Sequence, residues 1–117
     1  MDATARASWT RPPGVPVRVP PHPGRFLERN CLRPLRLTQV EAARLLGMSR
    51  RRVHEIVQGQ RGISADTAVR CALMFGIDTA FWLALQANWD SFRAWDQLRR
   101  ARAVPRAPRL LLVSSPR

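Results

Sequence analysis

The segment 39–58, QVEAARLLGMSRRRVHEIVQ, constrains the fold of this chain more than any other stretch. The small residue Ala43 precedes Gly47 by four positions, and a glycine accepts the positive φ that a tight turn after a helix requires. Val53 and Ile56 follow, three residues apart, on what would be one face of a second helix. The pattern therefore predicts two short helices, closely crossed at Ala43 and joined by a tight turn.

The outer face of the second predicted helix is polar and strongly basic. A helix held to its neighbour by Val53 and Ile56 can present its opposite face to the major groove of DNA. An ordinary pair of packed helices would satisfy the same apolar spacing, but three consecutive arginines are hard to explain by solubility alone. The side chains predicted to point away from the core follow the N-cap Ser49 and are those of Arg50, Arg51, Arg52, His54 and Glu55.

Individual contacts follow from position on this motif. Arginine can pair with a guanine edge through its planar fork, and it can also pair with phosphate. We expect base contacts from Ser49, Arg50, Arg51, His54 and Glu55. Phosphate contacts are expected from Gln39, Arg52 and Arg61. A purely solvent-facing role stays open for His54, Gln39 and Arg61.

Length and charge agree with a polyanion partner. The 117 residues leave room for one small domain plus tails, and the net charge is +12. Residues 1–21 contain five prolines and predict an extended or flexible arm. Residues 99–117 carry six arginines and no acid, which is half of the net charge, and predict a flexible basic tail. The predicted domain is therefore residues 22–98.

Caps and stops predict an all-α fold of five or six helices for this domain. A first helix should begin near Pro23 and stop before Pro34, and Thr38 with Glu41 forms a capping box. Beyond the central pair, Ser64 should cap a helix that Gly76 ends. We then expect a short helix capped by Asp78 and a separate last helix over about residues 88–101.

Five aromatic residues fall in these last two predicted helices. They could pack in the core or form a dimer interface, since four tryptophans are many for so small a domain and aromatic residues are enriched at interfaces. The predicted dimer interface comprises Phe81, Trp82, Trp89, Phe92 and Trp95. A two-fold dimer would bind an inverted repeat.

Cys31 and Cys71 lack metal-ligand spacing and fall in apolar helical patterns. Reduced core residues are favoured over a disulfide. Neither histidine belongs to a nucleophile motif, so we expect no enzyme activity and no cofactor or metal. A signal peptide and a transmembrane segment are both missing from the pattern, which predicts a cytoplasmic protein.

Five stretches together resemble the HigA antitoxins of the Xre, or lambda-repressor-like, helix-turn-helix group. They are HPG at 22–24, LRLTQ at 35–39, RRVHEIVQG at 51–59, RGISADTA at 61–68 and FWLALQ at 81–86. The resemblance covers roughly residues 22–95. Three residues depart from the family pattern. Arg36 stands where the family commonly has glycine, Arg25 stands in place of an acidic residue, and His54 stands where the family often has asparagine.

The resemblance implies the antitoxin of a type II toxin-antitoxin module. Such a protein binds operator DNA, represses its own operon and neutralises a HigB-like toxin that cleaves mRNA. The alternative is a stand-alone Xre-family transcriptional regulator without a toxin partner. A third and weaker alternative is a binder of RNA or nucleoid DNA driven by charge alone.

Overall fold

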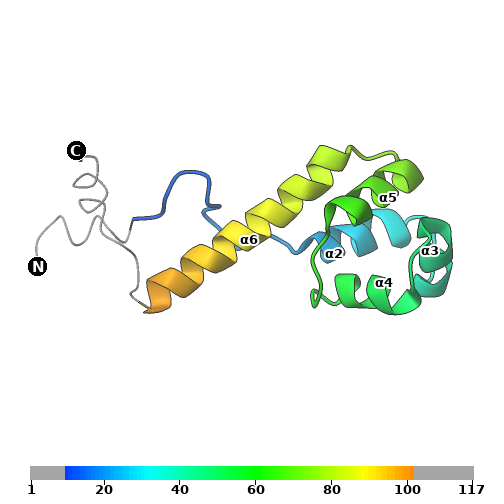
Figure 1. The fold of residues 1–117 in the computed structure, drawn as a ribbon, viewed down its shortest axis with the longest axis horizontal. Helices are drawn as coiled ribbons and strands as arrows, with labels where there is room; N and C mark the ends of the chain where they lie inside the picture. The colour runs from blue at the N-terminus through cyan, green and yellow to red at the C-terminus, as the bar shows by residue number, and fades with distance from the viewer. Residues whose placement is uncertain (1–9, 102–117) are drawn as a thin grey trace, which may run out of the picture.

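A computed structural model of the chain describes residues 10–101, and within this range all regular structure is helical (Figure 1). The expected all-α, lambda-repressor-like fold is confirmed. Most of the expected basic tail lies outside the described residues. The elements are α2 (Pro23–Phe26), η1 (Leu27–Leu32), α3 (Gln39–Leu46), α4 (Arg50–Val57), α5 (Ala65–Phe75) and α6 (Thr79–Ala101).

The first helix begins at Pro23, as its sequence predicts. The Nδ1 atom of His22 caps it by accepting a 2.9 Å hydrogen bond from the backbone N–H of Gly24. From Leu27 onward the backbone widens into the π-helix η1, which buries Leu27, Cys31 and Leu32. This helix therefore supplies one wall of the core.

Helices α3 and α4 form the predicted helix-turn-helix. Thr38 and Glu41 make the reciprocal capping box at the start of α3. Gly47 ends this helix with φ of 70°, in the left-handed region that favours glycine. Ser49 then caps α4 through a 3.1 Å bond from the backbone N–H of Arg52. These local signals decide where both helices begin and end.

The end of the domain differs from the sequence-based expectation. A short helix and a separate last helix were predicted, but α6 is one continuous helix of 23 residues. Asp78 does cap its start, accepting a 3.0 Å bond from the backbone N–H of Ala80. The intervening residues 83–90 contain no proline or glycine, so nothing interrupts the helix once it has begun.

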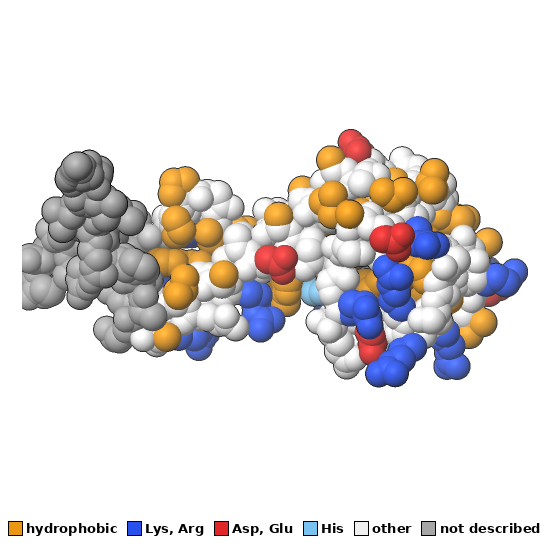
Figure 2. All heavy atoms as spheres, in the orientation of Figure 1, with side chains coloured by type: hydrophobic (Ala, Val, Ile, Leu, Met, Phe, Trp, Pro, Cys, Tyr) orange, Lys and Arg blue, Asp and Glu red, His pale blue; other side chains and the backbone are white. Residues whose placement is uncertain are grey.

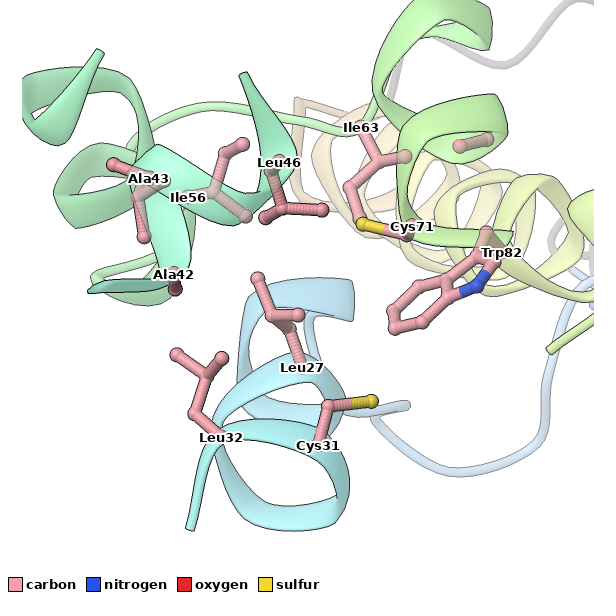
Figure 3. Packing of buried hydrophobic residues seen from close by; sticks show 12 residues of the cluster. Leu27, Cys31, Leu32, Ala42, Ala43, Leu46, Ile56, Ile63, Cys71 and Trp82 are labelled. Carbon is pink, nitrogen blue, oxygen red and sulfur yellow. The ribbon is translucent and has the colours of Figure 1, made fainter. Parts of the chain in front are cut away.

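The core lies where η1, α3, α4, α5 and the start of α6 meet (Figure 3). Trp82 is its largest member and is fully buried, with its ring against Phe26 at 5.3 Å between centroids. Cys31 and Cys71 are buried and unbridged, as expected. Burial raises the pKa of Cys31 to about 11 and that of Cys71 to about 12, so both thiols stay protonated.

The described part of the N-terminal arm, residues 10–21, has no helix or strand but lies against the protein rather than apart from it. The side chain of Val15 is 9% exposed, and Arg11 donates a 2.6 Å hydrogen bond to its carbonyl oxygen. Arg11 and Val17 border a hollow with Phe92 and Trp95 of α6. This segment therefore partly covers the outer half of α6.

Candidate nucleic-acid interface

The outward face of α4 presents three of the predicted DNA-reading side chains together. Val53 and Ile56 are fully buried and hold the helix to the core, which turns the opposite face to solvent. Arg50, Arg51 and His54 are exposed there and border one open hollow. Arginine side chains gather on this α3–α4 side of the molecule (Figure 2). The helix therefore offers a basic, solvent-exposed surface.

Glu55 joins two arginines across this surface. Its carboxylate accepts from Arg51 Nε at 3.1 Å and from Arg61 Nε at 2.9 Å. The hydrogen bond from Arg61, and then that from Arg51, holds the pKa of Glu55 below its ordinary value, so the group stays ionised. Glu55 thus orients an arginine of α4 and an arginine of the following loop; the base contact expected of it stays a prediction.

Gln39 and His54 come together from the two helices of the motif. His54 Nδ1 lies 3.1 Å from Gln39 Oε1. With the amide oxygen as acceptor, Nδ1 donates the proton and Nε2 is left for a partner outside the protein. The sequence placed both residues at the interface separately, and their pairing follows only from the crossing of α3 and α4.

The guanidinium of Arg52 is hydrogen-bonded to α5. Its guanidinium turns toward α5, and Nη2 donates to Asp66 Oδ2 at 3.2 Å and to Thr67 Oγ1 at 2.6 Å. The side chain is 28% exposed, against 86% for Arg51. Nη2 of Arg52 therefore serves the packing of α4 on α5, and the phosphate contact expected of this residue stays a prediction.

Arg70 of α5 is a residue of this region that sequence reasoning missed. Its Nη1 donates to the carbonyl oxygens of Leu46 at 3.0 Å and Gly47 at 3.1 Å, at the end of α3. Its Nε donates to Asp66 at 2.8 Å. The four-residue spacing of Asp66 and Arg70 was a visible signal for this ion pair, whereas the contact with the turn depends on the tertiary fold.

Comparison with known proteins now assigns the family. The Helix-turn-helix family model matches residues 29–82. Virulence-associated protein I of Dichelobacter nodosus is 44% identical over 69 residues, and the chain spans 64% of the length of that relative. The antitoxin HigA of Pseudomonas aeruginosa, solved with the higBA promoter, is 33% identical with a TM-score of 0.68, over 72% of this chain and 91% of that one. A HigA-family addiction module antidote protein from Coxiella burnetii gives 33% identity, a TM-score of 0.67 and the same two shares.

The chain belongs to the HigA family of Xre-type helix-turn-helix proteins. It is a DNA-binding regulator of the HigA structural type, a class of proteins that bind DNA and are not enzymes. The helices α3 and α4 fall within the matched range and form the helix-turn-helix of the family.

One departure from the HigA pattern has a visible structural consequence. Arg36 stands in the turn before α3 with φ of 56°. Among the described residues other than glycine, it alone has a positive φ. This conformation costs a side chain roughly 1–2 kcal/mol and costs glycine far less. The glycine common at this place in the HigA family therefore has a backbone reason.

The aromatic residues expected at a HigA dimer interface are not equivalent. Trp82 is fully buried in the domain core and offers no side-chain surface to a partner, which corrects that part of the expectation. Phe81 is 39% exposed although it contacts Phe26 at 5.0 Å. The other three, Trp89, Phe92 and Trp95, are half-buried along α6. Their participation in a dimer stays a prediction.

Two further findings concern other kinds of site. In residues 10–101, histidine, cysteine and acidic side chains do not gather in any group of three that could hold a metal ion. No described helix combines the length and the apolar character that crossing a membrane requires.

Proposed function

We propose that this chain is the antitoxin of a type II toxin-antitoxin module. In this role it binds operator DNA as a homodimer, represses its own operon and neutralises a HigB-like mRNA-cleaving toxin. The observation that carries the DNA-binding part is the basic outward face of α4, held by Val53 and Ile56 against the core. The cytoplasm is the compartment that such a partner set requires.

The solved relatives support this proposal. The Pseudomonas aeruginosa antitoxin HigA was solved with the higBA promoter, and PA4674 of the same organism was solved with its operator DNA. PA4674 is 34% identical to this chain over 70% of it, with a TM-score of 0.67. We infer an operator for this chain by analogy, with half-sites about 34 Å apart in an inverted repeat.

The proposed contacts follow the geometry of the helix-turn-helix. Base contacts come from the outward residues Ser49, Arg50, Arg51, His54 and Glu55. Phosphate contacts come from Gln39 at the start of α3 and from Arg61 after α4. Gln39 and His54 already touch, so one phosphate and one base edge can be held by a connected pair. Arg52 is left out because α5 binds it.

The proposed dimer uses the exposed apolar side chains of α6. Phe81 is 39% exposed, Leu83 37% and Leu98 42%. The half-buried Trp89, Phe92 and Trp95 complete this surface where the arm leaves them open. A two-fold axis near α6 would carry two copies of α4 to one side of the dimer, as an inverted repeat requires.

Toxin binding rests on the family rather than on a visible toxin site. A toxin that cuts mRNA is expected to have a basic active face, and a net charge of +12 on this chain opposes association with it. The contact must therefore be local and largely apolar. Helix α5 supplies such a surface in Val69, Leu73 and Met74, of which Leu73 is 82% exposed.

The deciding experiment is to look for a small gene next to that of this chain and to co-express the two. The antitoxin proposal predicts that this gene arrests growth alone, that the present chain restores growth, and that the two proteins co-purify. A harmless neighbour, or toxicity that persists beside this chain, would favour the stand-alone Xre-family regulator.

A further inference from the structure

A chain of polar contacts runs from the turn of the helix-turn-helix to the start of α4 by way of α5. Arg70 holds the carbonyl oxygens of Leu46 and Gly47 with one nitrogen and Asp66 with another. Asp66 in turn accepts from Arg52 of α4. One carboxylate therefore links the end of α3 to the first turn of α4 through two guanidinium groups.

At the end nearer the core, this series of polar contacts includes the buried residue Thr67. Thr67 is 1% exposed and accepts a 2.6 Å bond from Arg52, and its backbone N–H donates to the cap Ser64. The Nε atom of Arg52 is itself buried, without a hydrogen-bond partner in the described residues. The two hydrogen bonds from Nη2 to Asp66 and Thr67 therefore tie the first turn of α4 to α5.

At the other end of this series of polar contacts, Arg70 stabilises the C-terminus of α3. The last carbonyl oxygens of α3 have no partners within the helix and carry the negative end of its dipole, which a cation offsets. A Cβ on Gly47 would lie only 2.9 Å from Arg70 Nη1, so the guanidinium rests directly over the glycine of the turn. The position of Arg70 and the conformation of the turn are therefore coupled.

We propose that Asp66 and Arg70 are positioning residues for DNA reading, which set the orientation of α4 through Arg52 and through the turn at Gly47. This role requires no contact of Asp66 or Arg70 with DNA, and in it Arg52 contributes orientation rather than a phosphate contact. The inference rests on the proposed function, because it concerns how the operator is recognised. The hydrogen bonds from Arg70 and then Arg52 hold the pKa of Asp66 below its ordinary value, which keeps the linking carboxylate ionised.

The sign of one substitution separates positioning from electrostatics. Asp66→Asn removes a negative charge from a DNA-binding protein, which by itself strengthens binding to every sequence. Loss of the link between Arg52 and Arg70 instead lets α4 shift and weakens selective binding. The matched control is Glu28→Gln, which removes the same charge from a partly exposed residue of η1 that forms a 3.8 Å ion pair with Arg33.

The experiment measures the Kd of the full chain for two DNA duplexes of equal length and composition. One is the duplex that the wild-type chain selects from a randomised pool, and the other is its scrambled version. Asp66→Asn is expected to raise the Kd for the selected duplex about tenfold and to lower or keep that for the scrambled one. Glu28→Gln should leave the Kd for both duplexes unchanged or slightly lower. Asp66→Asn behaving like Glu28→Gln on both duplexes overturns the proposal.

Arg70→Lys tests the positioning role without a change of net charge. An NMR measurement tests it without DNA. Lysine keeps the charge but lacks the planar fork that reaches both carbonyl oxygens and Asp66, so the selective Kd should rise as in Asp66→Asn. Equal binding by Arg70→Lys and wild type contradicts the proposal.

In the NMR spectrum of Asp66→Asn, the backbone amide resonances of residues 47–52 should shift while those of η1 stay in place. If the turn resonances do not move, the positioning role is refuted, whatever the DNA measurements give. If the wild-type chain selects no duplex, that result counts against the proposed function and not against the positioning role.

Discussion

Gly24 of the first helix lies directly against the carbonyl oxygen of Ile56 in α4, so closely that a Cβ on Gly24 would overlap this oxygen. The backbone of Val57 adjoins the same point. Because backbone atoms cannot move aside as a side chain can, α2 and α4 cross at the closest approach that glycine permits. The position of the DNA-reading helix therefore depends on a missing side chain.

Gly24→Ala should destabilise the protein by at least about 2 kcal/mol, because the two helices must separate. Urea denaturation followed by circular dichroism measures the change. Gly62→Ala is the comparison and should lose less, since its Cβ would meet a side-chain amide, that of Gln86 at 2.9–3.0 Å, and displace at most the hydrogen bond that this amide accepts from the backbone N–H of Ile63. Equal losses in the two variants would contradict the close crossing.

Arg36→Gly should stabilise the protein by about 0.5–1 kcal/mol. The residue holds φ of 56°, a conformation that costs a side chain more than it costs glycine. The same measurement on Arg29→Gly, in the helical segment η1, should show a loss of about 1 kcal/mol. A loss of stability in Arg36→Gly would show that the turn is not strained.

His22 should make stability depend on pH. Burial lowers the pKa of His22 in the folded protein, against a smaller opposing effect of Asp90. The unfolded chain therefore binds protons more readily, so this contribution is present above the ordinary histidine pKa and is lost as pH falls through the lowered one. Protonation also removes the Nδ1 acceptor that caps Gly24.

The free energy of unfolding should therefore fall between about pH 7 and pH 5 more steeply in the wild type than in His22→Asn. Asparagine can cap the helix without titrating in this range. Subtracting the two profiles removes the contribution of acidic groups common to both. Parallel profiles would mean that His22 does not titrate differently in the folded state.

Trp95→Asp should convert the proposed dimer into a monomer, because a charge would enter the apolar surface of α6. Light scattering at micromolar concentration measures the mass. Gln97→Asp is the control, since Gln97 is an exposed residue of α6 and the variant introduces the same single negative charge. A wild-type monomer that binds an inverted repeat tightly would contradict the α6 dimer.

The sequence was most informative where signals are local. The caps at Thr38, Ser49 and Ser64 and the end at Gly47 each depend on residues within four positions, and each was found where expected. The basic outward face of α4 was predictable for the same reason, because the apolar spacing of one helix fixes its exposed side.

Features that depend on neighbouring elements were not predictable. Arg51 and Arg52 are adjacent arginines, yet one is exposed and the other is bound to α5, which no spacing within α4 reveals. Phe81 and Trp82 likewise differ only in which side of α6 meets the core. The continuity of α6 differs from the expectation of two helices, because no residue between the two apolar clusters breaks the helix.

The most direct test of sequence reading by α4 compares Arg51→Ala with Arg61→Ala, two arginines that share the partner Glu55. Fluorescence anisotropy would give the Kd of each for the selected duplex and for its scrambled version over a range of salt concentrations. Arg51→Ala should lose about 1–3 kcal/mol on the selected duplex alone, because it reads a base. Arg61→Ala should weaken both duplexes alike and reduce the salt slope by about 1. Equal loss on both duplexes from Arg51→Ala would contradict the claim that the outward face of α4 reads sequence.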